Sequence, residues 1–231
     1  MKTYIKQQLK ERYSTMYIKQ ALTVDDMLLS DSNKKQLKII AKMKGFFLIH
    51  SKSTGSGKSL AARIVADSIS DSALFIDASC AKSAKQIDNL DRKLAMHDLS
   101  NCSPVVVIDE IDKLNSQKLQ AISSAYNKFS THTDCVVIMT ANAIDKIPAN
   151  LLSRVNGIDF NQADNEELVI AKIAEVVDKE IEDEQLNSKF MQIIRMIISA
   201  SSGDIRKVFA YTEKYLLTRE IDKNPLIASG Y

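Results

Sequence analysis

Residues 51–59 read Ser-Lys-Ser-Thr-Gly-Ser-Gly-Lys-Ser and stand between an apolar run at 46–49 and a helical pattern at 60–66. A buried strand, a glycine-bearing loop, Gly-Lys-Ser and a helix are the successive parts of a phosphate-binding loop. The two glycines let backbone N–H groups turn toward one point, and the start of the helix adds partial positive charge there. This stretch therefore predicts an anion site suited to the phosphates of a nucleotide.

Successive residues of the loop and the helix start are expected to contact the nucleotide, namely Thr54, Gly55, Ser56, Gly57, Lys58, Ser59 and Leu60. Lys58 is expected to reach the β- and γ-phosphates, and the Ser59 hydroxyl to ligate Mg²⁺. The pattern departs from G-x-x-x-x-G-K-[ST] at Lys52, which replaces the first glycine. That position only starts the turn, so we expect a modified but working loop. The alternative is a Ser/Gly-rich surface turn.

Composition narrows the class of protein. The 231 residues fit one large domain or a medium domain with a small one, and the 45% hydrophobic and 26% charged content is ordinary for a globular protein. The net charge of +2 does not point to nucleic acid. Three cysteines without paired spacing argue against a disulfide framework and a zinc site. We see no signal peptide and no apolar run near ~18 residues, so we expect a cytoplasmic protein without membrane contact.

Short apolar runs alternate with helical patterns along the first two thirds of the chain. The runs lie at 46–49, 74–76, 104–108, 135–139 and 157–160, and the helical patterns at 32–43, 60–66, 83–96, 117–129 and 149–154. Continuous apolar strands separated by helices are typical of a parallel sheet covered on both faces. The pattern predicts an α/β P-loop NTPase fold with a five-stranded parallel sheet.

The pattern changes near residue 162. Three amphipathic helical stretches follow at 168–181, 190–199 and 204–217, with no strand between them. We therefore expect a small all-α lid domain over residues 162–231, after an α/β domain over 31–161. Residues 1–30 are expected to form an N-terminal docking segment with a short helix.

Two carboxylates end the third predicted strand. Asp109 and Glu110 follow four apolar residues, and ligands of doubly wound sheets lie beyond the carboxyl ends of the strands. Asp109 is expected to hold Mg²⁺, and Glu110 to polarise the attacking water. The alternative is an exposed acidic pair that caps the next turn.

Together, Gly55–Ser59 and Val106–Asp112 resemble the Walker pair of the AAA+ ATPases. Within that family the chain most resembles the small subunits of DNA sliding-clamp loaders, especially the T-even bacteriophage type. The resemblance implies ATP and Mg²⁺ as cofactors. It also implies that Asn142, after Met139-Thr140-Ala141, orients the lytic water.

Two arginines receive roles from the same resemblance. Arg154, in Leu151-Leu152-Ser153-Arg154, matches an arginine finger that acts on the ATP of a neighbouring subunit, although Val155 replaces the family's cysteine. Arg206, in Gly203-Asp204-Ile205-Arg206, matches the lid residue that contacts the γ-phosphate of its own subunit's ATP. Taken singly, Asn142 could be a turn residue, Arg154 a solvated helix end and Arg206 half of a surface ion pair.

The function implied by the resemblance is that of an ATP-hydrolysing subunit in a ring that opens a sliding clamp and places it on primer-template DNA. The implied partners are other AAA+ subunits, the clamp, and DNA held through its backbone phosphates. Lys82, Lys85 and Lys118 are candidate phosphate contacts, or ordinary solvated lysines. The alternatives are another DNA-associated AAA+ role, as a helicase loader or branch-migration motor, and an ATP-gated scaffold with little turnover.

Two departures bear on these expectations. Asp77 stands where the family usually has an asparagine that can hold the catalytic glutamate inactive. An ionised Asp77 would repel Glu110, so either that switch is altered or one carboxyl is protonated. The sequence also stops after the lid, without the helical collar of clamp-loader subunits, which fits either a truncated chain or assembly without a collar.

Overall fold

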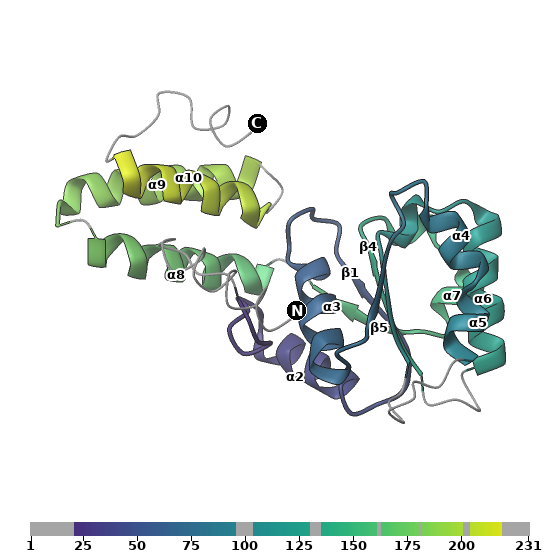
Figure 1. Cartoon of the computed structure of the whole chain (residues 1–231). Coiled ribbons are helices and arrows are strands. Elements are labelled where there is room, and N and C mark those ends of the chain that lie inside the picture. The colour runs from purple at the N-terminus through teal and green to yellow at the C-terminus, as the bar shows by residue number, and fades with distance from the viewer. Residues whose placement is uncertain are drawn as a thin grey trace. The chain divides into compact units, whose positions relative to one another are not determined.

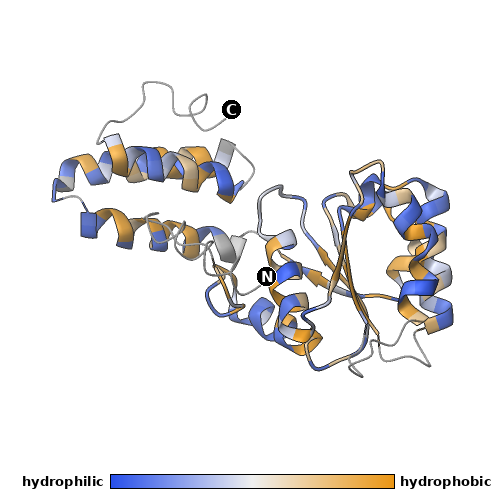
Figure 2. Ribbon diagram, viewed as in Figure 1, coloured by the Kyte–Doolittle hydropathy of each residue, from blue (hydrophilic) through white to orange (hydrophobic). Residues whose placement is uncertain are grey.

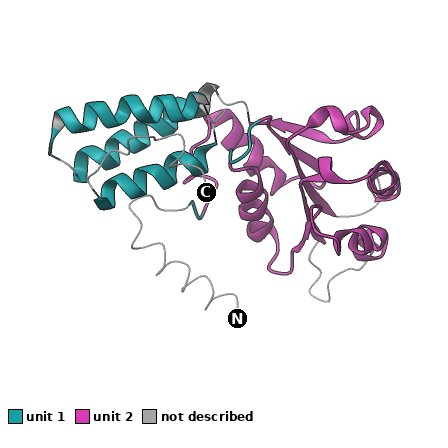
Figure 3. Cartoon of the chain, turned by 90° about the horizontal axis from the view of Figure 1, so that it is seen from above, with its two compact units in different colours: residues 1–22, 53–56, 162–231 teal, residues 23–52, 57–161 magenta. Residues whose placement is uncertain are grey.

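The computed structural model describes residues 21–95, 104–129, 135–160, 163–180, 182–200 and 204–218. The helix predicted within residues 1–20 lies outside this range. The chain forms two compact units (Figure 3). The first, which we call the α/β unit, holds residues 23–52 and 57–161. The second, the helical unit, holds residues 21–22 and 53–56 together with the described part of 162–231. The domain limits expected from the sequence stay predictions.

The α/β unit is built on a five-stranded, all-parallel sheet, as predicted. Its strands are β1 (Gly45–His50), β2 (Leu74–Asp77), β3 (Val105–Asp109), β4 (Val136–Ala141) and β5 (Asn156–Asp159). Their order across the sheet is β2-β3-β4-β1-β5. The strand of the phosphate loop is thus next to β4, and β3, which ends in the predicted carboxylate, pairs with β4 on the other side. The carboxyl ends of β1, β3 and β4 therefore meet at one edge.

Helices cover both faces of this sheet (Figure 1). One face carries α2 (Asp31–Ile40) and α3 (Lys58–Ile69), and the other carries α4 (Ser83–Asp88), α5 (Leu90–Ala95), α6 (Ser116–Phe129) and α7 (Ala149–Leu152). Two short 3₁₀ helices, η1 (Ile111–Lys113) and η2 (Ile144–Lys146), follow β3 and β4.

The core explains why the strands are apolar throughout. Alternate strand residues pack with α6 in one buried cluster that includes Phe46, Leu48, Val106, Ile108, Val137, Met139 and Ile122. The residues between them, such as Phe47, Ile49 and Val107, are equally buried toward the opposite face. A sheet with helices on both sides has no solvent-facing row, so the strands run orange through the centre of Figure 2.

One helix prediction needs correction. The pattern at 83–96 predicts a single helix, whereas the structure has α4 and α5 with a break at Asn89. The Asn89 side-chain amide donates to the Lys85 carbonyl at 2.9 Å, and its backbone N–H bonds the same carbonyl at 3.3 Å. A short amide side chain that satisfies a helical carbonyl in this way competes with helix continuation.

The helical unit contains α8 (Ala163–Glu180), α9 (Glu184–Ala200) and α10 (Ile205–Thr218). The first two are longer than the stretches predicted at 168–181 and 190–199, and the third is offset by one residue from the stretch predicted at 204–217. Phe190 of α9 stacks between two tyrosines of α10, with ring centroids 5.8 Å from Tyr211 and 3.9 Å from Tyr215. These rings bury the apolar stripes that the sequence pattern indicates. Within the described residues, no helix combines the length and apolar character needed to cross a bilayer.

Candidate nucleotide site

The loop after β1 has the backbone that its glycines allow. Gly55 and Gly57 have φ angles of 74° and 86°, in the left-handed region that other residues adopt only with strain. A side chain at Gly57 would also bring a Cβ within 3.4 Å of the Met27 methyl group. Gly57 precedes α3 directly and makes no side-chain cap, so the first N–H groups of this helix are not capped by the residue before it.

The residues that open α3 lie in two environments. Lys58 is buried, with 6% of the residue exposed, whereas Ser59 is exposed. The Ser59 hydroxyl donates to Oδ1 of Asp109 at 2.8 Å. The structure thus brings the predicted metal ligands of the phosphate loop and of β3 together. Leu60 follows in the first turn of α3 and is partly buried.

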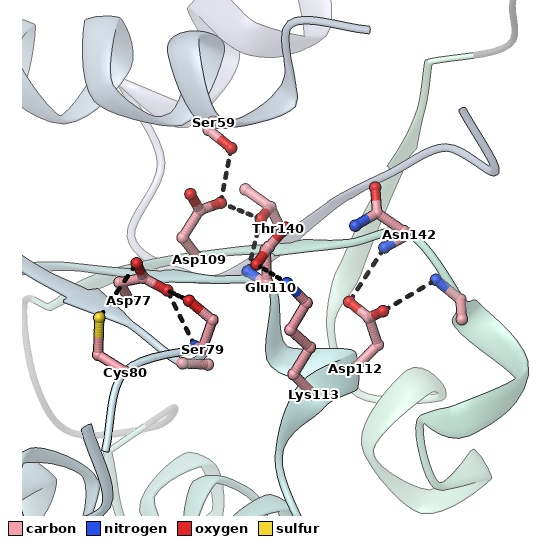
Figure 4. Close-up of polar contacts among 12 residues, drawn as sticks. Ser59, Asp77, Ser79, Cys80, Asp109, Glu110, Asp112, Lys113, Thr140 and Asn142 are labelled. Carbon is pink, nitrogen blue, oxygen red and sulfur yellow. Dashed lines mark hydrogen bonds and ion pairs between the residues drawn. The ribbon is translucent and has the colours of Figure 1, made fainter. Parts of the chain in front are cut away.

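A threonine that the sequence interpretation missed joins these groups. Thr140 of β4 is 1% exposed, and its hydroxyl donates to Oδ1 of Asp109 (Figure 4). The Thr140 hydroxyl oxygen in turn accepts the backbone N–H of Glu110 at 2.9 Å. The available signal was a hydroxyl residue directly after the apolar run at 135–139. Its position fixes the end of β3 against the end of β4.

Glu110 has an unusual backbone. Its φ of 57° and ψ of 47° make it the one non-glycine residue with positive φ in the described part of the chain. This conformation costs about 1–2 kcal/mol and is most often found at functional sites. The Glu110 carboxylate forms an ion pair with the ammonium of Lys113 on η1. The predicted base is therefore held from both its backbone and its side chain.

Asp77 has its own partners at the end of β2. Its Oδ1 accepts the backbone N–H of Ser79 at 2.9 Å and the Ser79 hydroxyl at 2.6 Å. These two bonds, with smaller contributions from Cys80 and Lys113, hold the pKa of Asp77 below its usual 3.8. The hydrogen bond to Glu110 raises the pKa of Lys113, aided by the charges of Glu110, Asp112 and Asp77. Asp77 is thus ionised at neutral pH, so Asp77 is not the protonated carboxyl of the second alternative.

Asn142 lies just beyond β4, and an unpredicted carboxylate holds its backbone. Asp112 of η1 is 8% exposed, and its Oδ1 accepts the Asn142 N–H at 3.1 Å. Its Oδ2 accepts the N–H of Ala143 at 3.4 Å. Figure 4 shows the side-chain amide of Asn142 pointing away from Asp112. Asn142 is thus near the carboxyl end of β3, where the family resemblance puts an amide that orients the water.

The two predicted arginines lie in different units. Arg154 follows α7, is exposed, and has no side-chain hydrogen bond or ion pair with any residue that the structure describes. Arg206 belongs to the helical unit, where its backbone N–H and its Nε donate to Oδ1 of Asp204 at 3.1 and 3.4 Å. The Arg206 side chain is 72% exposed. Its convergence with Lys58 on one triphosphate stays a prediction.

The three candidate DNA-binding lysines also differ. Lys118 forms an ion pair with Asp88, and its side chain is only 15% exposed. Lys82 and Lys85, at the start of α4, are both exposed. A lysine that is tied to a carboxylate and largely covered is a poor phosphate contact. The pair on α4 remains a candidate surface for a polyanion, and Lys118 does not.

The donor set suits Mg²⁺ held mainly by a nucleotide. Ser59 and Asp109 offer a hydroxyl and a carboxylate oxygen 2.8 Å apart. Mg²⁺ is commonly bound through one or two such groups plus phosphate oxygens and water. No three His, Cys, Asp or Glu side chains group as a metal cage among the residues described, and such a site needs none. Phosphoryl transfer to water is the chemistry that an anion loop, these oxygens and a nearby carboxylate can perform.

Comparisons with known proteins agree with this geometry. Residues 48–162, about half of the chain, match the family described as the ATPase family associated with various cellular activities (AAA). Two curated relatives are the sliding-clamp-loader large subunits of Enterobacteria phage T4 and Escherichia phage RB69, at 26% and 24% identity over 84% of this chain. The chain spans 61% of the length of each. These relatives are named large subunits, whereas the sequence resemblance above was to the small-subunit type.

Solved structures share the fold. The Thermotoga maritima RuvB Holliday junction branch migration motor superimposes with a TM-score of 0.61 at 16% identity, covering 90% of this chain and 71% of RuvB. A mutant of the same protein gives a TM-score of 0.59 at 18% identity, with the same coverage. At such identity the likeness establishes the architecture alone.

Proposed function

Because residues 48–162 of this chain are a domain of the AAA ATPase family, we propose that the protein hydrolyses ATP as one subunit of a clamp-loader-like ring. In this proposal the ring opens a sliding clamp and places it on primer-template DNA. The similarity to two phage clamp-loader large subunits over 84% of the chain supports this role over other AAA+ roles.

One observation carries the catalytic part of the proposal. A continuous hydrogen-bonded path runs from the Ser59 hydroxyl through the Asp109 carboxylate to Thr140 and the backbone of Glu110. It links the helix that follows the phosphate loop to the predicted base. A Ser/Gly-rich surface turn and an unrelated acidic pair would have no reason to meet in this way.

The residues then receive the following roles. The loop N–H groups and Lys58 bind the β- and γ-phosphates, and Ser59 and Asp109 hold Mg²⁺, which supplies charge neutralisation when bound. Glu110 accepts a proton from the attacking water, and the Asn142 amide orients that water. The ion pair with Lys113 must open or shift before Glu110 can act through Oε2, because the Lys113 ammonium occupies that oxygen.

Two arginines complete the proposed site. Arg154 acts on the nucleotide of the adjacent subunit, which is consistent with its exposure and with its lack of a side-chain partner among the described residues. Arg206 contacts the γ-phosphate in its own subunit. An arginine finger typically contributes ~10³–10⁵ in rate. Hydrolysis would therefore depend on assembly of the ring.

The proposed DNA contact is limited to backbone phosphates. Lys82 and Lys85 are the exposed lysines at the start of α4, and contacts of this kind give affinity without sequence choice. Binding should weaken steeply with salt. The logarithm of the binding constant should fall against the logarithm of the salt concentration with a slope of roughly −1 for each phosphate neutralised. Lys118 serves as the matched control because its ammonium is already paired with Asp88.

A subunit-mixing experiment tests the proposal. Glu110→Gln and Arg154→Ala are each expected to bind ATP and to fail in hydrolysis. A mixture of the two variants should regain activity. At some interfaces the Arg154→Ala subunit supplies an intact Glu110 and the Glu110→Gln subunit supplies an intact Arg154. Arg92→Ala, at another exposed arginine of the same unit, should behave as wild type. Equal loss of ATP binding and hydrolysis in Arg154→Ala, or no recovery on mixing, would contradict action between subunits.

Partner identification tests the remainder. Mass measurement of the protein with ATP and its genomic neighbours should give a ring that carries a sliding clamp. Recovery of a helicase instead would favour the helicase-loader alternative. ATP turnover of the wild-type protein is then measured with clamp and primed DNA and compared with that of Glu110→Gln. Equal turnover in the two would favour an ATP-gated scaffold.

A further inference from the structure

Asp112 is a buried carboxylate without a role in the proposed hydrolysis. It follows Glu110 by two positions in η1, and both of its carboxylate oxygens are used, one by the N–H of Asn142 and one by the N–H of Ala143. Ile111, beside it, is fully buried and anchors η1 in the core. The carboxylate therefore projects from a fixed turn onto the first two residues beyond β4.

These bonds complete a two-way brace between the ends of β3 and β4. From β4, the Thr140 hydroxyl reaches back to Asp109 and to the N–H of Glu110. From η1, Asp112 reaches across to Asn142 and Ala143. Figure 4 shows both sets of contacts side by side. The end of β3 is thus held by a residue of β4, and the residues after β4 are held by a residue that follows β3.

The brace uses both acceptor oxygens of the Asp112 side chain. Only a carboxylate offers two equivalent acceptor oxygens at this distance, and bonds from N–H groups to an ionised acceptor are about twice as strong as neutral ones. An amide in the same place would keep one acceptor oxygen and present an NH₂ donor to the second N–H. That replacement would release one of the two backbone groups and let the segment around Asn142 shift.

We infer that Asp112 is a positioning residue for hydrolysis, which sets the side-chain amide of Asn142 relative to Glu110 by anchoring the Asn142 backbone. This inference rests on the proposed ATPase function. The competing interpretation is purely structural, in which Asp112 only caps the start of η2.

Kinetics on the full chain with Mg-ATP, assembled with its ring neighbours, separates the two. Asp112→Ala should lower kcat about tenfold to hundredfold, the scale of an ~1 Å misplacement in an active site, with KM for ATP changed less than about twofold. Asp112→Asn should fall between wild type and Asp112→Ala. Asp145→Asn is the matched control, since Asp145 occupies the same position of the Ile-Asp-Lys turn η2 and is exposed. A kcat for Asp112→Asn equal to wild type would overturn the inference.

A double-mutant cycle supplies a readout that capping alone would not move. If Asp112 acts through Asn142, Asp112→Asn should lower kcat by less than about twofold when Asn142→Ala is already present. The same fold-loss in both backgrounds would mean that Asp112 is only structural.

Amide hydrogen exchange tests the anchor without any turnover. Asp112→Asn should speed exchange at Asn142 and Ala143 while leaving β3 protected, and Asp145→Asn should not. Unchanged exchange would overturn the inference even in an active enzyme. A wild-type protein that does not hydrolyse ATP would instead contradict the proposed function, while the exchange result still tests the anchor.

Discussion

The α/β unit contains the same tripeptide, Ile-Asp-Lys, in two 3₁₀ turns that make different contacts. In η1 the aspartate is buried and bonded to two backbone N–H groups, and the lysine pairs with Glu110. In η2 none of the three residues is buried. Both turns follow adjacent strands of one sheet, so neither the local sequence nor the general location accounts for the difference. The contacts are set by what each turn faces.

The residues that lead into the two turns show how the difference arises. Glu110, before η1, is in the left-handed region, and its N–H is bonded to Thr140. Ala143, before η2, has a φ of −111° and gives its N–H to Asp112. The first turn therefore provides the carboxylate, and the two residues before the second turn donate their N–H groups to it. The tripeptide of the second turn takes no part in these bonds.

Removing each aspartate in turn should give the largest contrast. Asp112→Ala leaves two N–H groups without their acceptor and is expected to lower the free energy of unfolding by about 2–4 kcal/mol. Asp145→Ala changes an exposed side chain and should stay within about 0.5 kcal/mol of wild type. Urea unfolding of both variants measures this, and similar losses in both would remove the distinction between the turns.

Glycine before each turn should act in opposite directions. Glu110→Gly relieves a left-handed backbone and should raise the free energy of unfolding by about 1 kcal/mol, while abolishing the proposed hydrolysis. Ala143→Gly relieves nothing and should lower it by about 0.5–1 kcal/mol through the greater entropy of the unfolded chain. Thermal and urea unfolding provide the readout. A loss of stability in Glu110→Gly that exceeds the loss in Lys113→Met, where only the ion pair is removed, would show that the backbone there is not strained.

The two lysines should differ less. Because the folded-state pKa of Lys113 lies above its ordinary 10.5, its pairing stabilises the fold below that pH and is lost as the pH rises through the raised value. Lys113→Met should cost less than about 1 kcal/mol near pH 8, since the pair is partly exposed, and the cost should vanish once the pH exceeds the raised pKa of Lys113. Lys146→Met should cost nothing at either pH. Urea unfolding at both pH values checks this, and a Lys113→Met cost that persists at high pH would argue for packing instead of charge.

The smallest expected effect is at Asp77, whose negative charge is one of the charges that raise the pKa of Lys113. Its lowered pKa means that it stabilises the fold above pH 3.8 and that this contribution disappears as the pH falls through the folded-state value. Ser79→Ala should raise the pKa of Asp77 toward 3.8, and Cys80→Ala should raise it less. An NMR titration of the Asp77 carboxyl carbon would measure both. An unchanged pKa of Asp77 in Ser79→Ala would mean that the hydrogen bond from the Ser79 hydroxyl does not lower it.

The strands and the site carboxylates were predictable because they depend on local pattern. One apolar run ends in Asp109-Glu110, and another is followed by Gly57-Lys58-Ser59 at the start of a helix. Both motifs follow strands, so they identify the edge of the sheet where the two groups of residues meet. The break at Asn89 was not predictable, because the helical spacing of apolar residues continues from α4 into α5. The break depends on the Asn89 side chain, which bonds the Lys85 carbonyl. The role of Asp112 was equally hidden, because its sequence is repeated at Asp145. Only the three-dimensional neighbours of each turn distinguish them.

The strand order has a consequence for how the chain reaches its folded state. β1, the first strand among the described residues to leave the ribosome, becomes an inner strand whose two neighbours are β4 and β5. Its pairing therefore waits for sequence that is about a hundred residues further along. Until then, the apolar residues Phe46–Ile49 stay open to other strands, a state that favours slow folding and aggregation. We expect chaperone dependence during synthesis to end only once Asp159 has emerged.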